Sequence, residues 1–76
     1  MKSINVRLTL IEDVQNFVNI LTKHHHIDAD LKSGRYTVNA KSLMGIFSLD
    51  LTKPIELVLY DENSGDLIKD LEKYTV

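Results

Sequence analysis

The residue with the clearest chemical potential is Ser42, which follows an alternating stretch and precedes the apolar segment 43–51. This pattern predicts a strand that ends shortly before the serine and a short helix that begins directly after it. Backbone N–H groups at a helix start lack partners, and the helix dipole favours negative charge there. The Ser42 hydroxyl could therefore cap the helix by accepting a hydrogen bond. Alternatively, it could be phosphorylated, which would add a charge of about −1.5 to −2.

The helix after Ser42 is more apolar than one buried stripe requires. Any one of its large side chains is best explained as part of the core, but together they exceed a single stripe, which indicates that one side of the helix meets a partner. Met is well suited to such a surface because its side chain is adaptable. The candidates for partner contact are Leu43, Met44 and Phe47.

The three consecutive histidines, His24, His25 and His26, are a second group that could do chemistry. Adjacent residues on a helix diverge by about 100°, so three neighbours rarely share one metal ion. Cationic side chains near a helix C-terminus are favourable without any further role, and a pairing of His26 with Asp28 is weak evidence for catalysis. The chain has no paired acid and base, glycine-rich phosphate loop or metal motif, so we expect no enzyme, no metal and no cofactor.

The composition favours one small globular domain, residues 1–76. The formal net charge of −2 argues against general binding to nucleic acid. The absence of cysteine fits a reducing compartment. No apolar run approaches 18 residues and no signal peptide opens the chain, so we expect a cytoplasmic protein without a membrane contact.

Hydrophobic periodicity predicts the elements that position these residues. The first helix is expected to begin with a capping box formed by Thr9 and Glu12, and its buried stripe to comprise Leu10, Val14, Phe17, Val18 and Leu21. Ser33-Gly34 predicts a hairpin turn, and Pro54 fits the entry of the last strand. The expected elements are strand 2–8, a helix to about residue 24, strands 27–32 and 36–40, helix 42–50, strand 55–60 and a final helix to residue 74.

This βαββαβα order predicts an α+β open-faced sandwich, with three helices on one face of a four-stranded antiparallel sheet.

The segment Thr37-Val38-Asn39 and the run Lys41-Ser42-Leu43-Met44-Gly45-Ile46-Phe47-Ser48-Leu49 resemble the regulatory-serine segment of HPr, the phosphocarrier of the bacterial sugar phosphotransferase system. The resemblance continues through the last strand, the acidic loop Asp61-Glu62-Asn63 and the last helix. It implies that Ser42 matches the serine phosphorylated by the HPr kinase. It also implies that Leu43, Met44 and Phe47 match apolar positions that dock protein partners, namely phosphotransferase enzymes and a transcriptional repressor.

The chain departs from HPr at the other phosphorylation site, a histidine in a Gly-x-His-x-Arg-Pro motif. Alignment on Asn16-Phe17-Val18 places Leu10 at the histidine, Glu12 at the arginine and Asp13 at the proline. Leucine has no nucleophilic nitrogen, and the two acids would repel a phosphate. The resemblance therefore implies a divergent HPr-like protein without the active-site histidine.

Three functions follow from this combination. The first is a regulatory or interaction protein of the catabolite-repression type that lacks phosphocarrier activity. The second is a working phosphocarrier that uses an unrecognised site. The third is a protein-binding domain that has drifted to another partner, for which the departures Glu12, Asp13, Asp50 and Pro54 speak.

Overall fold

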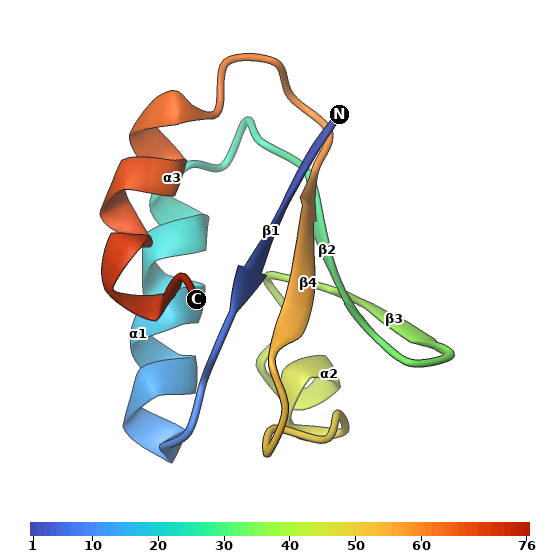
Figure 1. Ribbon diagram of the computed structural model, residues 1–76. Coiled ribbons are helices and arrows are strands. Elements are labelled where there is room, and N and C mark those ends of the chain that lie inside the picture. The colour runs from blue at the N-terminus through green and yellow to red at the C-terminus, as the bar shows by residue number, and fades with distance from the viewer.

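The order of elements in the computed structural model, which describes residues 1–76, is the βαββαβα order predicted from periodicity (Figure 1). A 3₁₀ turn, η1, follows the last helix. The elements are β1 (Lys2–Val6), α1 (Ile11–Lys23), β2 (Ala29–Ser33), β3 (Tyr36–Asn39), α2 (Leu43–Phe47), β4 (Ile55–Leu59), α3 (Gly65–Asp70) and η1 (Glu72–Tyr74). None of the helices is long and apolar enough to cross a membrane.

The four strands form one antiparallel sheet in the order β1-β4-β2-β3. The last strand in the sequence thus lies between the first and the second. Ile4 pairs with Leu57, which pairs with Leu31, which pairs with Val38. Because side chains across paired positions point to the same face, this register makes one apolar row across the sheet.

Helices cover the face of the sheet that carries the apolar row, while the opposite face is open (Figure 1). One cluster of 17 buried side chains joins the sheet to the helices. Phe17 of α1 lies in it fully buried, with its ring edge-on to Tyr74 at a centroid separation of 6.3 Å. Ile46 anchors α2 and Leu67 anchors α3 in the same cluster. The predicted open-faced sandwich is confirmed.

Several boundaries differ from the prediction. The ladder between β1 and β4 ends with the pair Val6–Ile55. Beyond Val6 the chain pairs with the C-terminal segment, where the Arg7 N–H donates to the Tyr74 carbonyl. The first strand therefore stops at residue 6 and not at residue 8.

The hairpin between β2 and β3 turns through two residues, Gly34 and Arg35, because Ser33 pairs with Tyr36. Gly34 has φ +60°, a left-handed conformation that glycine adopts without a Cβ clash. A glycine at the first central position is the pattern of a type II′ turn, whose twist matches that of the strands. The turn predicted at Ser33-Gly34 therefore lies one residue later, at Gly34-Arg35.

The first prediction concerns the core. Phe17→Ala should lower the free energy of unfolding by about 3–5 kcal/mol, because it leaves a cavity among fully buried neighbours. Tyr36, which is 71% exposed on the edge strand, provides the control; Tyr36→Ala should change stability by less than about 1 kcal/mol. Urea unfolding followed by circular dichroism measures both, and a loss below about 1 kcal/mol for Phe17→Ala would contradict this packing.

Candidate functional site

Ser42 is the N-cap residue of α2. Its backbone is extended, with φ −96° and ψ 106°, and its Oγ accepts a hydrogen bond from the Gly45 N–H at 3.1 Å. The Ile46 N–H donates to the Ser42 carbonyl at 3.0 Å, which closes the first turn. The capping role predicted for Ser42 is confirmed.

The segment before Ser42 is held by four further hydrogen bonds. The Asn39 side chain accepts from the Lys41 N–H at 2.8 Å, and the Asn39 carbonyl accepts from the Ser42 N–H at 3.0 Å. The Lys41 ammonium donates to the carbonyls of His25 at 3.3 Å and His24 at 3.5 Å, at the C-terminal end of α1. Lys41 thus ties the start of α2 to the end of α1.

The helix α2 spans five residues and is shorter than the predicted 42–50, because Ser48 ends it as the C-cap. Ile46 is fully buried, whereas Met44 is 84% exposed, Phe47 42% and Leu43 38%. Leu43 and Phe47 lie one turn apart and therefore share a side of the helix. The three side chains singled out from the sequence for partner contact are accessible.

Two exposed apolar residues at the start of α1 were missed by sequence reasoning. Leu10 is 60% exposed and Ile11 is 68% exposed. Leu10 was predicted to lie on the buried stripe, and that prediction was wrong. It is the N-cap residue, with an extended backbone, so its side chain does not follow the helical period.

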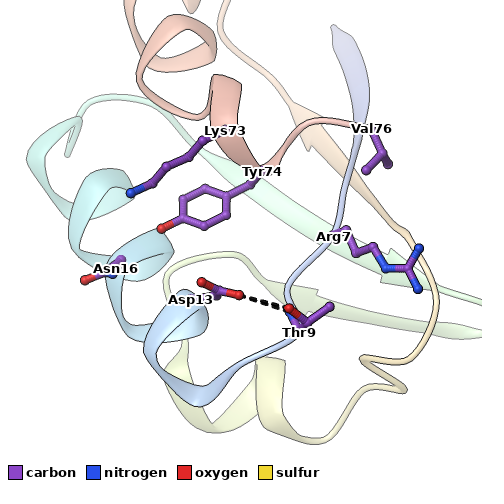
Figure 2. Close-up of a pocket in the computed structure, with 7 residues that line it drawn as sticks. All are labelled: Arg7, Thr9, Asp13, Asn16, Lys73, Tyr74 and Val76. Carbon is purple, nitrogen blue, oxygen red and sulfur yellow. Dashed lines mark hydrogen bonds between the residues drawn. The ribbon is translucent and has the colours of Figure 1, made fainter.

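The start of α1 is capped by an acid, but not by the predicted one. The Asp13 carboxylate accepts from the Thr9 hydroxyl at 3.2 Å and the Thr9 N–H at 3.3 Å (Figure 2). It also accepts from the Leu10 N–H at 3.1 Å. The helix begins at Ile11, so the third helical residue is Asp13 and Glu12 falls one position short. The capping box of Thr9 with Glu12 is therefore wrong, although the acid-capped start was correctly expected.

A shallow hollow of about 370 Å³ lies beside this cap (Figure 2). Its lining residues are Arg7, Thr9, Asp13, Asn16, Lys73, Tyr74 and Val76. The Tyr74 hydroxyl is buried without a hydrogen-bond partner, and the Lys73 ammonium lies 5.1 Å from the centroid of the Tyr74 ring. The Arg7 guanidinium points away from Tyr74 and donates to the Thr52 carbonyl at 3.5 Å. The two cations therefore do not converge on one point.

The histidines lie at the opposite end of α1. His24 is the C-cap residue, and its Nε2 lies 3.0 Å from Asp70 Oδ2 of α3. The rings of His25 and His26 meet edge-on, with centroids 5.8 Å apart. No three side chains of the His, Cys, Asp and Glu types converge as metal ligands. The contact that His24 makes joins two helices.

The loop that follows α2 contains a carboxyl group with a perturbed pKa. The Thr52 hydroxyl and the Thr52 N–H both donate to Asp50 Oδ1. These hydrogen bonds favour the charged form and hold the pKa of the Asp50 carboxyl below its usual value. On the open face of the sheet, the bond that the Tyr60 hydroxyl donates to Asp30 raises the pKa of Tyr60.

Known proteins give a consistent comparison at the level of structure. No model of a protein family matches the chain, and no curated protein sequence matches it. The solved structure of HPr-C-His from Thermoanaerobacter tengcongensis superposes with a TM-score of 0.79 at 24% identity, covering 96% of this chain and 89% of that chain. The phosphocarrier protein HPr from Bacillus anthracis str. Ames superposes with a TM-score of 0.70 at 26% identity, covering 99% of this chain and 94% of that chain. The chain is HPr-like, and its open-faced sandwich is that of the HPr structures.

The second prediction tests the cap at Ser42. Ser42→Ala should lower the free energy of unfolding by about 1 kcal/mol, because the Gly45 N–H loses its acceptor. Ser42→Asp should stay close to the wild type, since Asp caps a helix as well as Ser does. Chemical unfolding measures both variants, and equal losses for the two would contradict the capping role.

The third prediction concerns pH. Thr52→Val should raise the pKa of Asp50 towards its usual value, as followed by NMR titration of the side-chain carboxyl. Since the folded-state pKa of Asp50 is depressed, its stabilisation is present above the unfolded-state pKa and is lost as the pH falls through the folded-state pKa. Acidification should therefore destabilise the wild type more steeply than Thr52→Val. Thr22→Val is the matched control, because the Thr22 hydroxyl donates to a carbonyl and not to an acid.

Proposed function

We propose that this HPr-like chain has a regulatory or interaction role in the bacterial phosphotransferase system, in the cytoplasm, and does not carry phosphate on a histidine. The observation that carries this proposal is the start of α1. From the resemblance to HPr, a phosphate-accepting histidine is expected there. This chain instead has Leu10, whose N–H donates to Asp13. The three histidines of the chain follow the last helical residue of α1, Lys23.

The electrostatics at this end of α1 support the same conclusion. A phosphoryl group needs cationic or N–H donors, but the N–H groups of Thr9 and Leu10 already donate to the Asp13 carboxylate. Glu12 adds a second acid in the same helical turn. The C-terminal end of α1 is about 20 Å away, since the helix has 13 residues. None of the histidines there could take over a site at the helix start.

The regulatory part of the proposal rests on Ser42 and the apolar side of α2. The Ser42 hydroxyl would accept a phosphate from an HPr kinase, and the exposed side chains of Leu43, Met44 and Phe47 would contact a phosphotransferase enzyme, the kinase or a transcriptional repressor. Their exposure supports this role, because large apolar side chains at the surface of a small protein mark interaction sites. The change that a partner would read is the added negative charge.

A working phosphocarrier is the second candidate. It is favoured by the structural likeness to the HPr of Bacillus anthracis, which is named a phosphocarrier protein. This candidate requires an acceptor nitrogen elsewhere in the chain. A drifted protein-binding domain is a third candidate, and it would leave the exposed apolar side of α2 in use with a partner outside the phosphotransferase system.

The fourth prediction separates a working phosphocarrier from the other two candidates. Incubation with phosphoenolpyruvate and the first enzyme of the phosphotransferase system should leave the chain without an acid-labile phosphate. An HPr of the Bacillus anthracis type, treated in parallel, is the positive control. Acid-labile phosphate on His24, His25 or His26, mapped by mass spectrometry under neutral conditions, would overturn the proposal in favour of a working carrier.

A second incubation of the purified protein tests the regulatory site. Incubation with a purified HPr kinase and ATP should add one acid-stable phosphate, which should be absent from Ser42→Ala. Ser48→Ala, which changes the serine at the other end of α2, should still be modified. A wild-type chain that stays unmodified while HPr is phosphorylated would count against regulation at Ser42 and in favour of a drifted binding domain.

A further inference from the structure

Gly45 occupies a position where any side chain would meet Ser42. A Cβ added at residue 45 would lie 3.0 Å from Ser42 Oγ and 3.3 Å from Ser42 Cβ. It would also lie 3.2 Å from Val38 Cβ. The N–H of the same residue donates to Ser42 Oγ at 3.1 Å. Gly45 therefore contacts the hydroxyl oxygen through its backbone and leaves that oxygen its space by having no side chain.

We propose that Gly45 is a positioning residue for the phosphorylation of Ser42, because it sets where the acceptor hydroxyl lies. This inference rests on the regulatory role proposed for Ser42. It adds a residue that acts on the rate of transfer through the Ser42 hydroxyl.

The surroundings decide which group would move if residue 45 carried a methyl group. Val38 belongs to β3 and pairs with Leu31 in the sheet. The segment before Ser42 is held through Asn39 and through the Lys41 ammonium on α1. The Ser42 side chain, with a single rotatable bond to its hydroxyl, is the group that can give way most easily. An alanine at position 45 would thus turn the hydroxyl away from the added Cβ, and the remaining contacts of that Cβ, at 3.2 Å with Val38 Cβ and 3.3 Å with Ser42 Cβ, would shift α2 slightly.

The stability of the helix should change little in Gly45→Ala, although the hydroxyl is displaced. The turned hydroxyl would no longer accept from residue 45, which weakens the cap. Alanine, however, favours the helical conformation over glycine. The two effects oppose one another, so Gly45→Ala can remain folded while its hydroxyl is misplaced.

The transfer itself depends on the position of that oxygen. Ser42 Oγ attacks the γ-phosphorus of ATP, a new Oγ–P bond forms, and the bond from phosphorus to the β-phosphate oxygen breaks to release ADP. The hydroxyl proton passes to a base of the kinase. Reacting atoms must come within about 3–3.5 Å in line, and a misplacement of about 1 Å can cost about 100-fold in rate. The displaced hydroxyl should therefore lower kcat.

The test compares two glycine-to-alanine variants with a purified HPr kinase and ATP. Gly45→Ala should lower kcat at least tenfold and change KM less than threefold. Gly65→Ala is the matched control, because a Cβ at Gly65 in α3 would meet nothing within 4 Å; both of its constants should stay within twofold of the wild type. Met44→Ala should instead raise KM, since Met44 is proposed to contact the partner.

A measurement without the kinase tests the geometry by itself. NMR three-bond couplings between Hα and Hβ of Ser42 should show a changed χ1 rotamer in Gly45→Ala and the wild-type rotamer in Gly65→Ala. An unchanged rotamer, or phosphorylation of Gly45→Ala at the wild-type kcat, would overturn the inference. A wild-type chain that accepts no phosphate, combined with the expected change of rotamer, would instead overturn the proposed regulation at Ser42.

Discussion

The structure depends on the packing of one helical stripe against one apolar row of the sheet. Val14, Phe17 and Leu21 of α1 are fully buried, as are Leu57 and Leu31 in the two central strands. Burial of each such side chain contributes about 1.5–3 kcal/mol, and a domain of 76 residues has room for only one core. This packing holds α1 across the sheet, and α2 and α3 are anchored in the same core through Ile46 and Leu67.

The short helix α2 illustrates that dependence. Five residues cannot form a stable helix alone, because nucleation is costly and few hydrogen bonds follow it. The helix is held by Ile46 in the core, by the cap at Ser42, and by the Lys41 ammonium on the end of α1. A helix anchored on one side leaves its other side free, which is where Met44 and Phe47 are exposed. The same anchoring fixes the backbone around Ser42, so that the hydroxyl is presented from a rigid position.

The free backbone groups at the two ends of α1 are satisfied by different side chains. At its start, the carboxylate of Asp13 satisfies N–H groups that would otherwise be open to an external anion. At its end, Lys41 satisfies two carbonyls and His24 contacts Asp70 of α3. Both ends are closed by the protein's own side chains.

Sequence patterns predicted the features of the protein that are set by residues close together in the chain. The period of apolar residues predicted the order of strands and helices, and a serine before an apolar run predicted the cap at Ser42, since both are set by contacts within a few positions. The same reasoning was wrong by one residue at the start of α1. The helix begins at Ile11, so that Asp13 and not Glu12 caps it and Leu10 is exposed. Tertiary structure alone decided the placement of β4 between β1 and β2 and the contact of His24 with Asp70. These features arise from packing between segments far apart in the chain, which local patterns do not encode.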